Sequence, residues 1–172
     1  RVIDYYKLEG GEGMIRTHFE DGQRHGSSKW WHWNGKPAGT VRYVSGKEQG
    51  VETWWYENGQ KMRELTYEQG KLHGPAYAWH ENGKQEFSAA WKNGKPEGNY
   101  TEWYSSGKVM TTRVYAGGER DGIETHWYEN SQKAWEVNWQ SDQEQGVRVE
   151  WYENGKKTSE IPYKDGLRHG KA

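Results

Sequence analysis

Glycine recurs every 24 residues through this chain, and that spacing constrains the fold more than any other feature of the sequence. It occupies the last position of seven consecutive 24-residue blocks without a gap. A fixed period of this length is the signature of a tandem array of one small structural unit. The blocks are residues 3–26, 27–50, 51–74, 75–98, 99–122, 123–146 and 147–170. We therefore predict a single repeat domain over residues 1–172.

Aromatic residues keep the same period as the glycines. Position 17 of the block is aromatic in all seven copies, and position 5 is tryptophan in six. The first block, 3–26, is the most degenerate and carries Lys7 at position 5. Because a terminal repeat has only one neighbour, a worn first copy is typical of a cap. We expect residues 3–26 to be that cap.

Composition restricts the kind of core and the kinds of partner. Only 31% of residues are hydrophobic, but 12 Trp and 12 Tyr supply apolar area, so we expect an ordered fold held together by aromatic rings. The chain has no cysteine, which excludes disulfides and thiolate metal sites. It has no apolar run long enough for a membrane span. Its 24 basic residues are interleaved with 25 acidic ones, so we do not expect nucleic-acid binding.

Each block reads as two β-strands joined by a short loop. The stretch 51–56 is β-branched and aromatic, and 133–139 alternates apolar and polar residues. Period two with strand-favouring residues indicates β-structure. Glu-Asn-Gly between the two stretches is typical of a hairpin loop, since Asn and Gly tolerate left-handed backbone angles. The predicted fold class is all-β: an elongated, curved single ribbon of tandem antiparallel hairpins, with about fourteen strands that each pair with their sequence neighbours.

The length of the hairpin loop decides which side chains share a face. A two-residue Asn-Gly loop would turn the position-5 tryptophan away from the position-17 aromatic. A three-residue Glu-Asn-Gly loop ending in a left-handed bulge would place positions 1, 3, 5, 13, 15 and 17 together. The second register collects residues such as Trp55, Leu65 and Tyr67 on one apolar face. We favour it, because a one-residue slip turns every side chain to the other face.

Positions 2, 4 and 6 then lie opposite the core, and the partner-binding residues are expected there and in the adjoining loop. Tryptophan at position 4 in two blocks, and at position 7 in one, departs from the repeat, and exposed aromatic residues are enriched at binding hot spots. Two alternatives stay open: position-6 side chains could be ladder contacts between hairpins, and residues 2–6 could cover these rings. The candidate binding residues are Trp30, His32, Trp33, Trp54, Tyr56, His80 and Tyr104.

Catalytic and metal sites are not expected. His25, His73 and His169 recur at position 23 of different blocks, so a ribbon would keep them too far apart to bind one ion. Acidic residues of successive loops, such as Glu57 and Glu81, are expected to be solvated rather than paired about one bond. We therefore expect no enzyme activity, no metal and no cofactor.

Three segments resemble the core of the MORN repeat, an aromatic residue followed by spaced glycine and a His-Gly pair: residues 19–26, 67–74 and 163–170. Joined to Trp-Tyr-Glu-Asn-Gly, as in 55–59, the whole unit is similar to the bacterial variant of that repeat, whose members are described as YwqK-type antitoxins. The resemblance implies a curved β-ribbon and a non-enzymatic immunity protein that neutralises a partner toxin by binding it.

Two other functions remain alternatives. Trp/Tyr/Gly hairpin repeats also serve glycan, cell-wall and choline recognition, where paired aromatic rings form cages. An open ribbon also exposes two unpaired strands, which would allow a scaffold that forms a homodimer edge to edge. The absence of cysteine favours the cytoplasm, while export after removal of a signal peptide stays open, because the chain starts at Arg1.

Overall fold

The computed structural model describes residues 2–7 and 14–170, and every regular element in them is a β-strand. The chain forms two compact units, Arg1–Lys84 and Gln85–Ala172. The first contains β1 (Val2–Lys7, described for its backbone only), β2 (Met14–Glu20), β3 (Gln23–Arg24), β4 (Gly26–Trp31), β5 (Pro37–Val44), β6 (Lys47–Glu48), β7 (Gly50–Trp55), β8 (Lys61–Glu68) and β9 (Lys71–Trp79). The second contains β10 (Gln85–Lys92), β11 (Lys95–Trp103), β12 (Val109–Ala116), β13 (Glu119–Arg120), β14 (Gly122–Trp127), β15 (Lys133–Gln140), β16 (Gln143–Trp151), β17 (Lys157–Lys164) and β18 (Leu167–Arg168).

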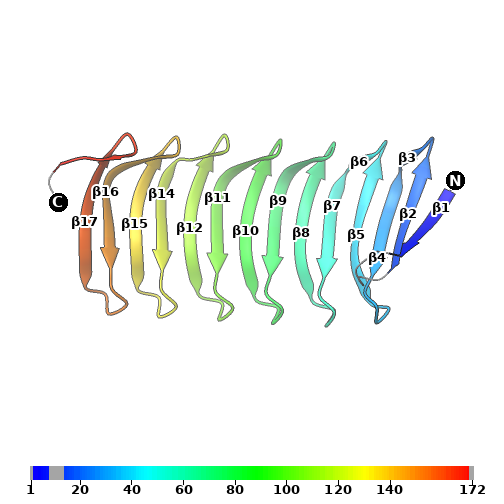
Figure 1. Cartoon of the computed structure of the whole chain (residues 1–172), viewed down its shortest axis with the longest axis horizontal. Coiled ribbons are helices and arrows are strands. Elements are labelled where there is room, and N and C mark those ends of the chain that lie inside the picture. The colour runs from blue at the N-terminus through cyan, green and yellow to red at the C-terminus, as the bar shows by residue number, and fades with distance from the viewer. Residues whose placement is uncertain (1, 8–13, 171–172) are drawn as a thin grey trace. The chain divides into compact units, whose positions relative to one another are not determined.

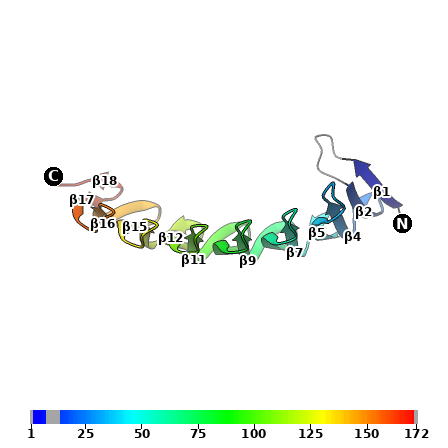
Figure 2. The same cartoon turned by 90° about the horizontal axis from the view of Figure 1, so that it is seen from below.

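Within each unit the strands pair antiparallel in chain order (Figure 1). Figure 2 looks along the strands and shows them as one layer within each unit. This confirms the predicted all-β fold of tandem antiparallel hairpins. The expectation of one domain over residues 1–172 stays a prediction.

The hairpin loop has the predicted three-residue form. In the third block the Tyr56 amide donates to the Gln60 carbonyl at 2.9 Å, and the Gly59 amide donates to the Tyr56 carbonyl at 2.8 Å. Gly59 has φ 90°, in the left-handed region that glycine tolerates. The Asn58 side-chain oxygen accepts from the Gln60 amide at 2.9 Å, which fixes the turn. Glu-Asn-Gly therefore forms the loop because Asn58 caps the turn and Gly59 adopts the left-handed backbone angle.

The predicted sharing of faces is wrong, because a second bulge follows the loop. Trp55 lies opposite Lys61, but Trp54 lies opposite Arg63, so Met62 is an extra residue on its strand. The same shift occurs at four other hairpins. One extra residue reverses the pairing parity. Positions 2 and 4 therefore share a face with 13, 15 and 17, whereas positions 1, 3 and 5 lie on the opposite face.

We call the side that carries positions 2, 4, 13, 15 and 17 the packed face. The least exposed apolar residues there include Val41, Ala76 and Val137, the last of which is 1% exposed. Ala38 and Ala134, at the bulge position, are also buried. The position-1 side chains on the opposite face, such as Val51, are exposed. The apolar core is thus a thin strip along the packed face of each unit.

The glycine at position 24 stands at a backbone irregularity between one hairpin and the next. It has positive φ in every block, for example 106° at Gly74 and 124° at Gly122. A side chain is disfavoured at such angles. A Cβ on Gly74 would also lie 3.3 Å from the Cβ of Thr66. The 24-residue spacing of glycine therefore marks a repeated left-handed backbone position.

Candidate functional site

Two tryptophans meet over a glycine on the packed face of the first unit. Gly39 of β5 lies opposite Trp30 of β4 and also opposite Trp54 of β7, so the three residues form one cross-strand row. The two indole ring centroids are 4.5 Å apart, in an edge-on arrangement at 60°. A Cβ on Gly39 would lie 2.0 Å from Cζ2 of Trp30, so only glycine leaves room for this contact.

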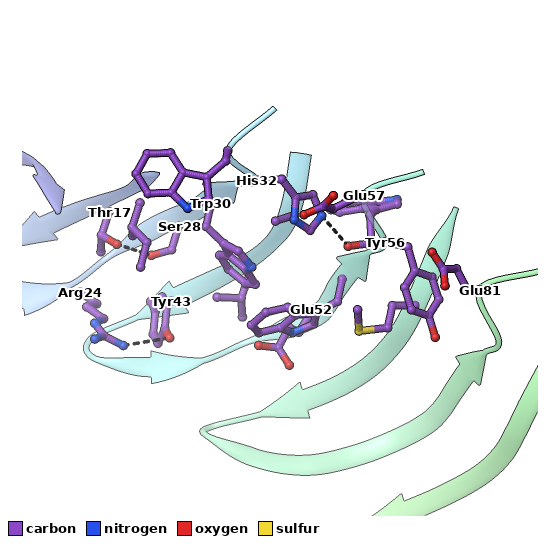
Figure 3. A pocket seen from close by; sticks show the side chains of 17 residues that line it. Thr17, Arg24, Ser28, Trp30, His32, Tyr43, Glu52, Tyr56, Glu57 and Glu81 are labelled. Atoms are coloured by element: carbon purple, nitrogen blue, oxygen red, sulfur yellow. Dashed lines mark hydrogen bonds between the residues drawn. The ribbon is translucent and has the colours of Figure 1, made fainter. Parts of the chain in front are cut away.

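These rings form part of a hollow of about 610 Å³ in the first unit (Figure 3). Its aromatic lining is Trp30, Trp33, Tyr43, Trp54, Trp55 and Tyr56. The apolar lining is completed by Ile15, Ala38, Val41 and Met62. Trp33 is 58% exposed in the loop after β4. The volume falls within the range of about 300–1,000 Å³ that is typical of binding pockets.

Five of the seven predicted binding residues line this hollow: Trp30, His32, Trp33, Trp54 and Tyr56. Trp30 and Trp54 lie on the packed face, and the prediction that they lie opposite the core is wrong, for the register reason given above. Residues 2–7 pair with β2 through their backbone, but their side chains are outside the described residues. Whether side chains of residues 2–6 cover the rings therefore stays a prediction.

The other two predicted residues are elsewhere. His80 begins the loop after β9, where its amide donates to the Lys84 carbonyl at 2.8 Å, and it does not line the hollow. Tyr104 belongs to the second unit, and its hydroxyl donates to the Trp127 carbonyl at 2.7 Å. The structure therefore does not bring these two residues together with the other five.

Position 6 makes a ladder of contacts between successive hairpins. The Tyr56 hydroxyl donates to the Trp79 carbonyl of the next block at 2.8 Å. In the same way, the Tyr104 and Tyr128 hydroxyls each donate to the position-5 tryptophan carbonyl of the block that follows. His32 takes the place of tyrosine, and its Nε2 donates to the Trp55 carbonyl at 2.9 Å. These are the ladder contacts considered as the alternative role for position 6. They also fix the rings that form one end of the hollow.

Acidic groups outnumber basic ones around the hollow. Glu52, Glu57 and Glu81 contribute carboxylates, while the guanidinium of Arg24 donates to the Tyr43 hydroxyl at 3.0 Å (Figure 3). Burial raises the pKa of that hydroxyl. The indole Nε1 atoms of Trp30 and Trp54 are buried without an acceptor among the described residues. The hollow is therefore aromatic in its walls and negative in its balance of charge.

The packed face of the second unit carries a group of paired charges beside its buried apolar residues. Arg113 of β12 lies between two carboxylates, 3.3 Å from Glu102 and 3.2 Å from Glu124. Glu124 is buried, and a second guanidinium, Arg120, lies 3.9 Å from its other oxygen. Asp142 accepts from the Arg120 side chain at 2.8 Å, and this hydrogen bond lowers the pKa of the carboxyl. The second unit thus joins arginine and carboxylate side chains into a network of ion pairs on its packed face.

His126 lies near Glu102, Glu124 and Arg113, and its titration is expected to make the stability of the fold depend on pH. Burial lowers its pKa below the ordinary value of 6.5, although Glu102 and Glu124 oppose the shift. In acid the unfolded chain therefore binds a proton at His126 before the folded chain does, so stability falls as pH decreases through 6.5. We expect His126→Asn to lose less stability between pH 7.5 and 5.5 than the parent, as measured by urea unfolding at both pH values. An identical loss of stability in both proteins would contradict the assignment of this pH dependence to His126.

The described residues contain no cluster of three or more His, Asp or Glu side chains arranged to hold a metal ion. Among these same residues there is also no helix with the length and apolarity needed to cross a bilayer.

Comparison with known proteins identifies the repeat unit in three segments of the chain. The sequence profile of the MORN repeat variant matches residues 48–69, 96–116 and 144–165. A search of curated proteins found no match to this sequence. Among solved structures, the chain is similar to a mutant of S. aureus TarM in complex with fondaparinux, alpha-GlcNAc-glycerol and UDP, with 11% identity and a TM-score of 0.36. That match covers 69% of this chain and 21% of the TarM chain.

Proposed function

We propose that this protein is a non-enzymatic binding scaffold that recognises another protein through the aromatic hollow of its first unit. The observation that carries the proposal is the convergence of Trp30, Trp33 and Trp54, each a departure from the repeat, on one hollow. Tryptophan and tyrosine dominate binding hot spots because they bury large areas with little loss of side-chain freedom. The match to the MORN repeat variant supports a repeat-based binding scaffold.

The finer proposal is that the partner is a protein toxin and that the chain is its antitoxin. It is supported by the similarity of the repeat unit to the MORN variant of YwqK-type antitoxins. Binding of this kind neutralises the partner by covering its working surface and needs no reaction centre on the scaffold. The partner would then be the product of a neighbouring reading frame. Co-expression of the two genes should restore growth that the neighbour alone suppresses.

A loop substitution separates the role of the hollow from the stability of the fold. Trp33→Ala removes an exposed loop ring, so we expect little change in melting temperature. Truncation of a hot spot costs about 2 kcal/mol or more, so binding of the neighbouring gene product should weaken by about 30-fold. Isothermal titration calorimetry with the purified pair measures this change.

Tyr152→Ala is the matched control, since it removes a ring that is equally exposed, 60%, in a loop of the second unit. It should leave the affinity within about twofold of the parent value. Equal losses from Trp33→Ala and Tyr152→Ala would count against the hollow as the binding surface. Failure to capture the neighbouring gene product, together with failure to rescue growth, would count against the antitoxin proposal.

A further inference from the structure

Arginine side chains lie over aromatic rings along the packed face of both units. The distances from the guanidinium carbon to the ring centroid are 5.2 Å for Arg24 over Tyr43, 4.5 Å for Arg63 over Trp54, 4.8 Å for Arg113 over Tyr100, 3.5 Å for Arg120 over Trp139 and 4.6 Å for Arg148 over Trp135. On the opposite face, Lys61 lies over Trp79, Lys133 lies over Trp151, and Arg16 lies over Trp31 at 5.8 Å. On the packed face, the cation that lies over an aromatic ring is an arginine in all five of these contacts.

The second unit completes each of these stacks with a carboxylate. Arg113 pairs with Glu102 and Glu124, and Arg148 pairs with Glu144 and Glu150. A guanidinium that is stacked on a ring and donates to a carboxylate satisfies both its flat face and its edge.

In the hollow of the first unit, Arg24 lies over Tyr43 and Arg63 lies over Trp54, but no arginine joins a ring to the carboxylates of Glu57 and Glu81 among the described residues. The Trp30 and Trp54 rings meet edge-on, and no arginine lies over the ring of Trp30 among the described residues. Glu57 and Glu81 occupy position 7 of successive loops, on the same side of the hollow as Tyr56 in Figure 3. In the part of the chain that the structure describes, neither carboxylate forms an ion pair.

We propose that an arginine side chain of the partner protein enters this hollow. Its guanidinium stacks against an indole of the hollow that carries no arginine, such as Trp30, and donates to the unpaired carboxylates of Glu57 and Glu81. This inference rests on the proposed function and names the chemistry of the partner: a basic loop with an accessible arginine. Lysine is a poorer fit, because a compact ammonium group lacks the planar fork that stacks and bridges at the same time.

The test follows indole signals by NMR in the ¹⁵N-labelled full chain, with Trp30→Phe, Trp33→Phe and Trp54→Phe used for assignment. The probe is N-acetylarginine amide, and its uncharged analogue N-acetylcitrulline amide has the same shape. We expect saturable shifts of the Trp30, Trp33 and Trp54 signals with the arginine probe, and about fivefold or more weaker binding of the citrulline analogue. Equal binding of the two probes, or no shift of these three signals, would overturn the inference.

Substitution of the carboxylates supplies the matched control. Glu57→Gln with Glu81→Gln should weaken binding of the arginine probe about fivefold. Glu129→Gln with Glu153→Gln changes the same loop position in the second unit and should leave binding unchanged. Choline, a cation without hydrogen-bond donors, should bind more weakly than arginine. Choline binding that equals or exceeds that of the arginine probe would identify a quaternary ammonium cage instead and overturn the assignment to arginine.

Binding of the neighbouring gene product to the parent and to the substituted proteins distinguishes failure of this inference from failure of the proposed function. If the neighbouring gene product binds the parent and the Glu57→Gln, Glu81→Gln protein equally well, the scaffold function stands and the arginine assignment falls. If binding of the partner weakens with this pair of substitutions but not with the pair in the second unit, both stand.

Discussion

Replacement of Gly39 by alanine is expected to destabilise the first unit by about 1–3 kcal/mol, the usual cost of overpacking a filled site. The added Cβ would lie 2.0 Å from Cζ2 and 2.1 Å from Cε2 of Trp30. Gly39 does not have the positive φ of the turn glycines, so the cost is steric and not a backbone effect. Trp54 lies opposite Gly39 on the other neighbouring strand, so its ring blocks movement of the Trp30 indole along the row. Thermal unfolding should show a melting temperature several degrees lower.

A second background shows whether Trp30 is the cause. In a Trp30→Leu protein, where the ring is absent, Gly39→Ala should cost little or nothing further. Similar costs in both backgrounds would contradict the steric explanation. The substitution should also weaken partner binding, because displacement of Trp30 changes the wall of the hollow. The same glycine thus links the stability of the first unit to the shape of its candidate site.

The hairpins could be predicted from the sequence because their determinants are local. Asn58 and Gly59 are the residue types that a three-residue loop requires, and the structure uses them in that way. The assignment of faces failed because it depends on Met62, the extra residue of the second bulge. Its position carries Ala, Met, Glu or Thr in different blocks, so no residue type signals the bulge. Only the pairing of whole strands decides it.

The candidate site could be predicted in part, for a reason that is separate from the faces. Trp30, Trp33 and Trp54 stand out because neighbouring copies carry other residues at those positions, and a departure from a repeat is visible without knowledge of the register. Gly39 was missed. It is also a departure, since its position carries a side chain in the five following blocks. Its role depends on two strands that bring indoles to it from both sides, which a scan for aromatic residues does not detect.

Removal of the guanidinium of Arg113 is the other substitution expected to have a large effect. Arg113→Met keeps an apolar stem over Tyr100 but leaves Glu124, whose side chain is only 6% exposed, with Arg120 at 3.9 Å as its remaining cation. Breaking a buried ion pair from one side costs about 3–5 kcal/mol, because the remaining charge stays desolvated. Arg113 is itself 25% exposed, so we expect about 2–3 kcal/mol in urea unfolding at pH 7.

The companion substitution decides whether the cost comes from the orphaned charge or from lost packing. Arg113→Met combined with Glu124→Leu removes both charges, and Glu102 keeps the Tyr100 hydroxyl as a donor at 2.6 Å. The double variant should therefore be about 1–2 kcal/mol more stable than the sum of the two single losses predicts. Strict additivity would mean that Arg113 acts as a packed side chain rather than as a counter-ion. Coupling would show that the ion pair between Arg113 and Glu124 stabilises the second unit, and this guanidinium–carboxylate contact is the kind that we propose between a partner arginine and the hollow of the first unit.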